Sequence, residues 1–234
     1  MKAPYPENES ERLAALKRFH ILDTDQESEY DHLTALASYI CETPIAVISL
    51  VDESRQWFKS SVGVSVRETP REMAFCAHAI LDDQVLIVED ALKDPRFVDN
   101  ALVLSDPHIR FYAGAPLATP DGFKLGTLCV IDQKPRKLNA DQIQALQHLR
   151  AQVEALFSLR HTLHQLNQTL DQVKILSGLL PICSYCKKVR DEDGYWQQVE
   201  SYIRNHSEAD FSHGLCQECL KEHFPDIAKK MNLF

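Results

Sequence analysis

The stretch IAVISLVDESRQWFKS, residues 45–60, indicates the fold of this chain more directly than any other. Its first part, 45–52, is apolar and rich in β-branched residues, which is typical of a buried strand. DESR then provides a turn, and QWFKSSVG at 56–63 is predicted as the partner strand of a hairpin. We therefore expect an antiparallel pair within a larger sheet.

Around this hairpin, hydrophobic spacing and turn residues predict three helices and three further strands. The helices cover 9–20, 29–42 and 73–81, and the strands cover 85–90, 111–119 and 125–132. The strand cores at 47–51 and 128–131 are apolar on both faces, so we expect them at the centre of the sheet. The order of elements predicts an α+β fold, with a mixed, mainly antiparallel sheet flanked by helices.

A long helix is predicted over 138–180, because this stretch has no proline and its one glycine lies near its end. Its apolar residues recur in steps of three and four: Leu146, Leu149, Val153, Leu156, Leu159, Leu163, Leu166, Leu170 and Val173. This is a heptad pattern with one stammer, an extra step of three at Leu156–Leu159. At about 60 Å, such a helix calls for a partner, and a parallel homodimer over 138–178 is the simplest one. In the alternative, the first half packs on the chain's own sheet and only the second half pairs.

Four cysteines near the end of the chain carry its strongest chemical signal. Cys183 and Cys186 form one C-x-x-C pair, and Cys216 and Cys219 form another. Two such pairs can complete a closed tetrahedral Cys₄ shell around a structural Zn²⁺ ion. The alternatives are reduced thiols in an ordinary core, or a reversible dithiol switch. His213, in SHGLC, either replaces one cysteine or, as we expect, donates a hydrogen bond to a thiolate.

Composition limits the partners and the compartment. The 234 residues carry a formal net charge of −9, so neither nucleic acid nor an anionic membrane is expected as a partner. The N-terminus is polar, and no apolar stretch approaches the roughly 20 residues of a membrane span. We therefore expect a cytoplasmic protein, whose reducing surroundings leave thiols free for metal. The other cysteines, Cys41, Cys76 and Cys129, lie in apolar stretches, where packing is their default role.

Several ordered blocks of sequence form a set that runs through two-thirds of the chain. They are R-x-x-x-L and ILDT within 18–24, IAVISLVDESRQWFKS at 45–60, ETPREMAFCAHAI at 68–80, VEDALKDPRFVDNALV at 88–103, IRFYAGAPL at 109–117 and LGTLCVID at 125–132. Together they resemble the GAF family of sensory domains, in particular the subgroup found in bacterial histidine kinases and diguanylate cyclases. The tail 181–224 resembles a short cysteine-rich segment appended to some bacterial sensory proteins and response regulators.

The GAF resemblance implies a six-stranded antiparallel sheet, with helices on one side and an open or vestigial ligand pocket on the other. It also implies that the terminal helices form a dimer bundle that carries the signal. The phytochrome pattern around a bilin is absent, so no chromophore is expected. The cysteine spacing of the free-methionine-sulfoxide reductases that share this fold is not recognisable either.

Four residues of the sensory part are candidates for ligand contact. Cys76 and His78, in FCAH, could touch a ligand from one short helix, although a packed cysteine and a hydrogen-bonded histidine are the simpler interpretation. Arg110 and Tyr112 lie close to Asp-Pro turns and could bind an anionic ligand, although a surface salt bridge is the ordinary role of such an arginine. A single histidine among apolar residues gives no basis for haem.

We find no hydrolase triad, phosphate loop or H-E-x-x-H motif, and we therefore expect a non-enzymatic sensor or adaptor. In this interpretation 1–137 is a GAF domain (helices 9–42 included), 138–178 a linker helix or coiled coil, and 179–234 a zinc-stapled module. The GAF domain binds a small ligand or is vestigial, and it signals through the dimeric helix to the module, which docks on an unidentified signalling protein. The alternatives are a thiol-dependent oxidoreductase that uses a C-x-x-C pair or Cys76, and a dimerisation scaffold without ligand.

Overall fold

The computed structural model describes residues 2–173, 180–191, 193–206 and 210–231. The chain divides into two compact units, Met1–Gln165 and Leu166–Phe234, and each is described by itself. The first unit contains a six-stranded sheet with the strand order β3-β2-β1-β6-β5-β4. Its strands are β1 (Ile45–Val51), β2 (Arg55–Val62), β3 (Glu68–Pro70), β4 (Leu86–Val88), β5 (Phe111–Ala118) and β6 (Lys124–Asp132).

Every neighbouring pair in this sheet is antiparallel. The six-stranded antiparallel sheet implied by the GAF resemblance is therefore confirmed, and the mixed sheet expected from the order of elements was wrong. The predicted hairpin and the central positions of β1 and β6 are also confirmed. All seven residues of β1 are buried, because successive side chains point to opposite faces and both faces are covered. Ile48 and Leu50 lie in one apolar cluster, and Val47 and Val51 lie in the other.

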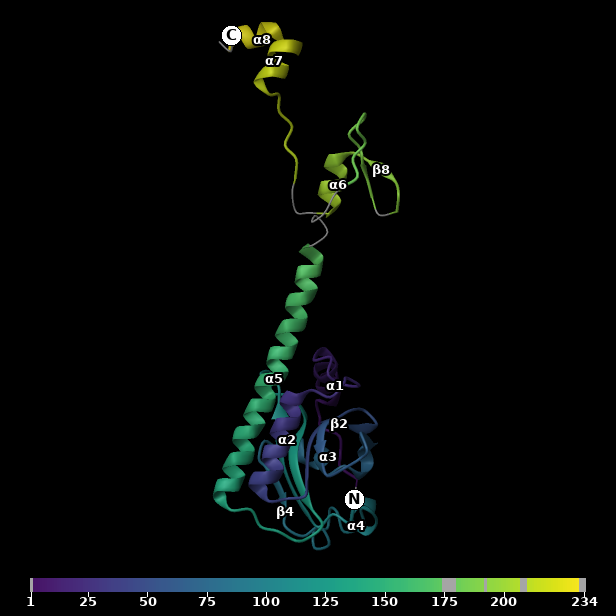
Figure 1. The fold of residues 1–234 in the computed structure, drawn as a ribbon, viewed down its shortest axis with the longest axis vertical. Helices are drawn as coiled ribbons and strands as arrows, with labels where there is room; N and C mark the ends of the chain where they lie inside the picture. The colour runs from purple at the N-terminus through teal and green to yellow at the C-terminus, as the bar shows by residue number, and fades with distance from the viewer. Residues whose placement is uncertain (1, 174–179, 192, 207–209, 232–234) are drawn as a thin grey trace. The chain divides into compact units, whose positions relative to one another are not determined.

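Three helices cover one face of the sheet: α1 (Glu9–Arg18), α2 (Ser28–Cys41) and the first part of α5 (Ala140–Val173). Figure 1 shows α2 and α5 side by side, and the Gln142 side chain donates to the carbonyl of Ile40 at 3.1 Å. Asn139 and Gln142 exchange side-chain and backbone hydrogen bonds at the start of α5, which is the arrangement of a capping box.

The other face carries shorter elements around the second apolar cluster. They are the 3₁₀ turn η1 (Arg71–Met73), α3 (Phe75–Ala79) and α4 (Ala101–Leu104). The ring of Phe75 stacks on that of Phe97, with centroids 3.9 Å apart. The helix predicted over 73–81 is confirmed, but it is shorter and covers the five residues Phe75–Ala79.

The strand β2 contains a bulge at Lys59. Ile48 pairs with Ser60 and the next residue, Ser49, pairs with Phe58, so Lys59 has no partner on β1. Bulges of this kind re-aim side chains. Here Phe58 faces the cluster around α3, whereas both Lys59 and Ser60 contact the region of α2.

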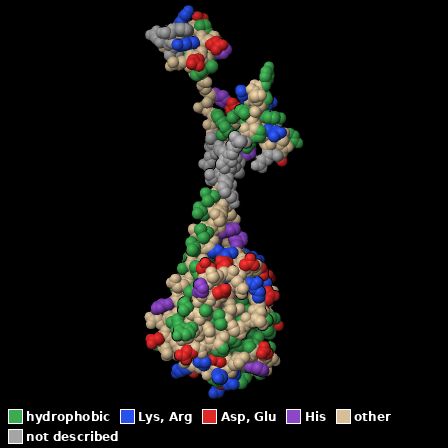
Figure 2. Space-filling model, in the orientation of Figure 1, with side chains coloured by type: hydrophobic (Ala, Val, Ile, Leu, Met, Phe, Trp, Pro, Cys, Tyr) green, Lys and Arg blue, Asp and Glu red, His purple; other side chains and the backbone are tan. Residues whose placement is uncertain are grey.

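The helix α5 changes its surroundings along its length. Leu146, Val153 and Phe157 are 0%, 0% and 3% exposed and pack against the sheet. Beyond them, Leu159, Leu163, Leu166 and Leu170 are 48–55% exposed, and Figure 2 shows hydrophobic side chains along this part of the helix. At 100° per residue, these leucines lie roughly 200° around the helix from Phe157.

The expectation of one continuous heptad seam that starts at Leu146 is therefore corrected, because the first half of the helix packs on the chain's own sheet. This arrangement agrees with the alternative in which only the second half is available for a partner. The stammer marks the change from a core-facing stripe to an exposed one. The last part of the predicted helix, 174–178, lies outside the described residues.

The second unit has small elements: β7 (Val189–Arg190), β8 (Trp196–Gln197), α6 (Val199–His206), α7 (Gln217–His223) and α8 (Pro225–Lys230). β7 and β8 pair antiparallel around a turn in which Gly194 has φ +90°. Asp193-Gly194 is a dipeptide typical of such tight hairpin turns. Over the described residues, no helix is both long and apolar enough to cross a bilayer.

Candidate ligand cavity and its link to the C-terminal helix

A cavity of about 380 Å³ lies on the α3 side of the sheet. It is bounded by β1, β2 and β3, by the loop 63–66, by α3 and by the turn at 106–109. This volume lies in the range of small-molecule sites. Most of its lining is apolar, and none of its lining residues is lysine or arginine.

Two polar atoms in the lining of this cavity are buried without a hydrogen-bond partner. They are Oε1 of Gln56 and Oγ1 of Thr69. The two residues face each other across the β2–β3 ladder, and Gln56 is 8% exposed. A buried polar atom without a partner costs about 1–3 kcal/mol. The cavity thus offers one unsatisfied acceptor and one unsatisfied hydroxyl at the same place.

Of the four predicted ligand-contact residues, Cys76 and Tyr112 line the cavity. The hydroxyls of Thr127 and Tyr112 donate to Cys76 Sγ at 3.0 and 3.3 Å. Burial opposes ionisation of this thiol, but hydrogen bonds from Cys129, Ser49, Thr127 and Tyr112 outweigh it and lower the pKa of Cys76. The hydrogen bond to Cys76, together with burial, raises the pKa of Cys129.

His78 and Arg110 are not among the lining residues. The ring of His78 packs edge-on against Phe97, with centroids 4.8 Å apart. Arg110 makes a two-point ion pair with Asp90, at 2.9 and 3.0 Å, and this contact lowers the pKa of Asp90. Arg110 thus makes the salt bridge that is the ordinary role of such an arginine.

A wider, open hollow of about 600 Å³ lies near β4 and the start of the 135–137 segment. Its charged groups include Glu89, Asp90 and Arg136, and Arg136 is paired with Asp132. The smaller cavity is the better candidate for a ligand site, because it is more enclosed, more apolar and has polar atoms that lack partners.

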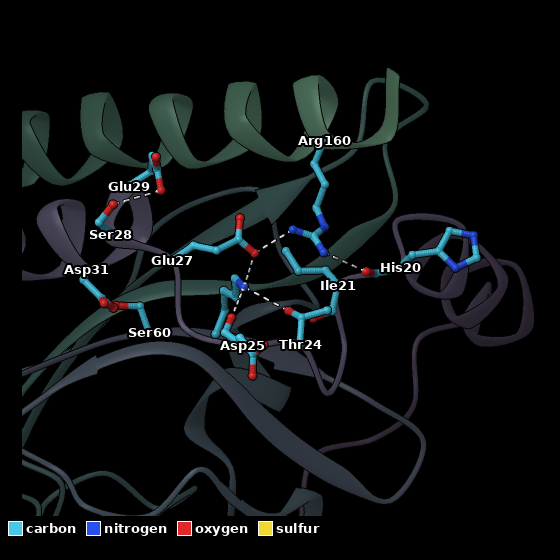
Figure 3. A network of polar contacts seen from close by, with 11 residues as sticks. His20, Ile21, Thr24, Asp25, Glu27, Ser28, Glu29, Asp31, Ser60 and Arg160 are labelled. Atoms are coloured by element: carbon cyan, nitrogen blue, oxygen red, sulfur yellow. Dashed lines mark hydrogen bonds and ion pairs between the residues drawn. The ribbon is translucent and has the colours of Figure 1, made fainter. Parts of the chain in front are cut away.

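A polar network joins the sheet to α5 on the opposite face (Figure 3). The fully buried ammonium of Lys59 donates to Thr24 Oγ1, to the carbonyl of Asp25 and to Glu27 Oε1, at 2.9, 2.7 and 2.5 Å. The guanidinium of Arg160 reaches the same oxygen of Glu27 at 2.6 Å. Glu27 is thus held between a strand lysine and a helix arginine. We call Lys59, Glu27 and Arg160 the clamp.

The clamp lies where α5 changes from buried to exposed, three residues after Phe157. Burial alone would raise the pKa of Glu27, but Lys59 and Arg160 lower it. Beside the clamp, Ser60 Oγ donates to Asp31 Oδ1 at 2.6 Å, which ties the same strand to α2. The strand β2 therefore contacts the cavity with one face and the helices with the other.

The four cysteines of the second unit are arranged as two local pairs. The backbone N–H of Cys186 points to Sγ of Cys183 at 3.5 Å, and that of Cys219 points to Sγ of Cys216 at the same distance. Within the described part of the chain, no three Cys, His, Asp or Glu side chains are grouped closely enough to hold a metal ion. The zinc-stapled module is therefore not supported by the arrangement of the described residues. His213 is exposed.

Sequence reasoning missed Gln56, Thr69 and the clamp. A signal was available, since Gln56 and Lys59 are polar residues within QWFKSSV, a stretch predicted as a strand of the sheet. The bulge that turns Lys59 toward α2 has no comparable signal, because no glycine marks it.

Comparison with known proteins gives one family and one curated relative. The family model described as GAF domain matches residues 25–156. A cyclic di-GMP phosphodiesterase of Pseudomonas aeruginosa is 46% identical over 165 residues, which are 70% of this chain and 28% of that protein. The chain thus spans about 28% of the length of this relative.

Solved structures of low sequence identity are also similar. The GAF domain of an Acinetobacter phosphoenolpyruvate-protein phosphotransferase is 17% identical, with a TM-score of 0.48, over 66% of this chain and 98% of that one. The PixJ GAF domain of Thermosynechococcus elongatus is 14% identical, with a TM-score of 0.49, over 64% of this chain and 94% of that one.

The curated relative corrects one expectation. The sequence was expected to encode a non-enzymatic protein, whereas this relative, at 46% identity, is named as an enzyme. The absence of familiar catalytic motifs was therefore an insufficient basis for excluding enzymes.

Proposed function

The chain belongs to the GAF domain family, and on that premise we propose that it is a sensor whose GAF unit binds a small molecule in the 380 Å³ cavity and transmits its occupancy to α5. The observation that carries this proposal is the pair of unpartnered buried atoms on Gln56 and Thr69. Both residues line this mainly apolar cavity. A ligand that hydrogen-bonds to them removes the cost of leaving them unsatisfied.

The lining indicates the chemistry of the ligand. The cavity has no positive side chain in its lining and has the carboxylate of Asp106. An anionic ligand would therefore be repelled, and an uncharged or cationic molecule with an apolar body is favoured. The ligand should carry an N–H or O–H group for the acceptor on Gln56.

The test is a thermal-shift screen of the full chain against uncharged, cationic and anionic metabolites. We expect a hit from the first two classes, and we expect Gln56→Leu to reduce its shift at a given concentration. The matched control is Gln84→Leu, since Gln84 is an exposed loop residue away from the cavity. Equal shifts in the wild type and in Gln56→Leu would contradict the proposed site.

Transmission in this proposal runs through β2. Gln56 and Phe58 line the cavity, and Lys59, next along the strand, holds Glu27 and through it Arg160 of α5. A ligand that shifts β2 at Gln56 changes the position of the Lys59 ammonium. Because Glu27 Oε1 accepts from both cations, such a shift alters the hold on α5 where its exposed part begins.

The exposed leucines of α5 support a homodimer as the first partner. Leu159, Leu163, Leu166 and Leu170 are spaced 4, 3 and 4 residues apart, which is a regular heptad stripe. Each is about half exposed in the single chain. A second copy of the chain, with the same stripe, is the simplest molecule to cover it.

For the tail, we retain structural zinc as a proposal. Its support is the donor set, four thiols in two C-x-x-C pairs, each with a backbone N–H directed at the first sulfur. These residues would hold the ion in a closed shell, and the ion would supply folding free energy to the tail. The proposed role of the tail is docking to a signalling protein.

The curated relative suggests the pathway. We propose that the GAF unit provides regulatory input to cyclic di-GMP turnover, supported by the 46% identity to a cyclic di-GMP phosphodiesterase. Cyclic di-GMP measured by mass spectrometry, in cells that express the chain or its Gln56→Leu variant, should differ between the two. Equal levels in both and in cells without the chain would contradict this role.

A further inference from the structure

Two cysteines of the GAF unit, Cys76 on α3 and Cys129 on β6, have their sulfur atoms 3.9 Å apart. Both residues are 1% exposed, and both are free thiols. A disulfide bond is about 2.0 Å long, so an approach of about 2 Å would join them. Because α3 is a five-residue helix outside the sheet, it can make this approach while β6 stays paired with its neighbours.

Two hydroxyl groups donate hydrogen bonds directly to the Cys76 sulfur. Thr127 Oγ1 and Tyr112 OH donate to Cys76 Sγ at 3.0 and 3.3 Å, and Ser49 Oγ lies 3.3 Å from Thr127 Oγ1. Donors around a sulfur stabilise its thiolate, and the thiolate is the nucleophilic form. The two cysteines therefore differ: Cys76 is the attacking thiol and Cys129 is the neighbour that remains protonated.

Access from the cavity also favours Cys76 over Cys129. Cys76 lines the 380 Å³ cavity, and Cys129 is not among its lining residues. A molecule inside the cavity therefore meets Cys76 first. Since no lysine or arginine lines this mainly apolar space, the reagent that enters most readily is small and uncharged.

We propose that Cys76, which lines the cavity, and the adjacent Cys129 form a two-electron redox switch, with a small uncharged hydroperoxide as its oxidant. Cys76 Sγ attacks the terminal peroxide oxygen, the O–O bond breaks, and the leaving oxygen takes the thiol proton to depart as water or an alcohol. Cys76 is then a sulfenic acid. The Cys129 thiol attacks this sulfur, its proton leaves with the hydroxyl as a second water, and the disulfide forms. The two thiols lose two electrons and two protons, and one peroxide bond is reduced.

This inference uses the same cavity as the proposed ligand site but does not depend on a resident ligand. The closing of the disulfide would draw α3 toward β6 and change the lining beside Tyr112. A sensory unit with this pair would respond to oxidant as well as to its ligand.

The test is disulfide mapping on the reduced full chain after titration with hydrogen peroxide. Free thiols are then alkylated, and the chain is digested with trypsin without reductant. We expect the peptide 72–93, which holds Cys76, to be joined to the peptide 125–136, which holds Cys129. Cys41 is the internal control, because it is buried at the end of α2 and its burial raises its pKa; it should stay reduced.

Two variants separate the steps. In Cys129→Ser, the joined peptide cannot form and Cys76 should instead be labelled by dimedone, a reagent for sulfenic acids. In Thr127→Val, which removes a donor at nearly constant shape, Cys76 should react about tenfold more slowly, as expected for the loss of one hydrogen bond.

The proposal is overturned if Cys76 stays alkylatable at doses that oxidise the tail cysteines Cys183 and Cys186. It is also overturned if Cys76 reacts no faster than Cys41 in the folded wild type, a comparison that needs no variant. If the metabolite screen finds no ligand but peptides 72–93 and 125–136 are joined, the ligand proposal fails and the redox switch stands. If a ligand is found but Cys76 does not react with peroxide, the redox switch fails and the ligand proposal stands.

Discussion

The GAF unit and the C-terminal unit differ in what holds them together. In the GAF unit, two apolar clusters fill the two faces of one sheet, and the central strand β1 is buried over its whole length. In the described part of the C-terminal unit, the buried hydrophobic residues are Val189, Tyr202 and Ala228, whereas aromatic side chains such as Tyr185 and Tyr195 are 95% and 74% exposed. Apolar burial stabilises the first unit, and the second needs another source of folding free energy.

The GAF unit differs in how its surface and its interior carry charge. Side chains of both charge signs are interspersed over the face seen in Figure 2. Its one fully buried ammonium, among the described residues, is that of Lys59, and it has three hydrogen-bond acceptors. The unit therefore tolerates a charge in its interior because that charge is completely paired.

Metal removal should produce the largest difference in folding between the two units. If zinc holds the tail, a chelator removes on the order of 10 kcal/mol of folding free energy from it and leaves the GAF unit folded. Hydrogen exchange followed by mass spectrometry should show loss of protection in 180–231 and no change in the sheet. Added zinc should restore the protection. Unchanged exchange in the tail of metal-free protein would contradict the zinc proposal.

Truncation of a core residue should instead destabilise the GAF unit and leave the tail unaffected. Leu128→Ala, at a fully buried position on β6, should cost about 2–5 kcal/mol, measured by urea unfolding followed through the GAF unit. Val189→Ala in the tail is the counterpart and should leave that transition unchanged. A shift of the GAF transition by the tail variant would show that the two units unfold together.

Loss of the clamp should lower the free energy of unfolding by a smaller amount, and this loss should depend on pH. Lys59→Met should cost about 2 kcal/mol at neutral pH, because it removes the partner of three acceptors while keeping the space filled. The exposed Lys137 offers the control Lys137→Met, with an effect within about 0.5 kcal/mol.

The same variant should change how stability depends on acid. Glu27 has a folded pKa below its usual 4.5, so its pairing stabilises the wild type fully above that pH and is lost as the pH falls through the folded pKa. The urea midpoint should be measured from pH 6 to pH 3, which are about one to two units above and below the usual pKa of a glutamate. Over this range it should fall less steeply in Lys59→Met than in the wild type. Parallel slopes would contradict the role of Lys59 at Glu27.

The smallest effect on the fold is expected at the leucine stripe. Leu163→Glu changes a half-exposed residue, so the stability of the GAF unit should move by less than about 0.5 kcal/mol. The proposed dimer should nevertheless dissociate, because a charge then faces its own copy at the seam. Light scattering after size-exclusion chromatography measures the molar mass and so reports dissociation. Leu159→Glu should also yield a monomer. A dimer that survives both variants would place the interface elsewhere.

Much of the GAF unit could be predicted from sequence because its signals are local. The β-branched runs predicted the central strands. Pro44, which disfavours a helical residue before it, lies shortly after the end of α2, where Glu42 has a left-handed φ of +53°. Hydrophobic spacing also predicted α5, but it could not say what covers the stripe. Leu146 meets a sheet and Leu163 meets solvent, although both occupy the same repeating pattern.

The candidate site was harder to predict because it depends on which residues face each other. Gln56 and Thr69 are brought together by strand register, and Glu27 and Arg160 are separated by 133 residues in sequence. Cys76 and Tyr112 line the cavity, whereas Arg110, which was selected on the same grounds as Tyr112, is paired with Asp90. Position along the chain could not distinguish these two outcomes.

The change of face along α5 has a practical consequence for anyone who builds hybrid receptors from this GAF unit. Each residue turns a helix by about 100°, so the joint with a foreign output domain fixes the azimuth at which that domain starts. Spacers of seven residues preserve the azimuth to within about 20°, whereas spacers of two nearly invert it. Hybrids joined beyond Leu170 should therefore work or fail with a periodicity set by spacer length.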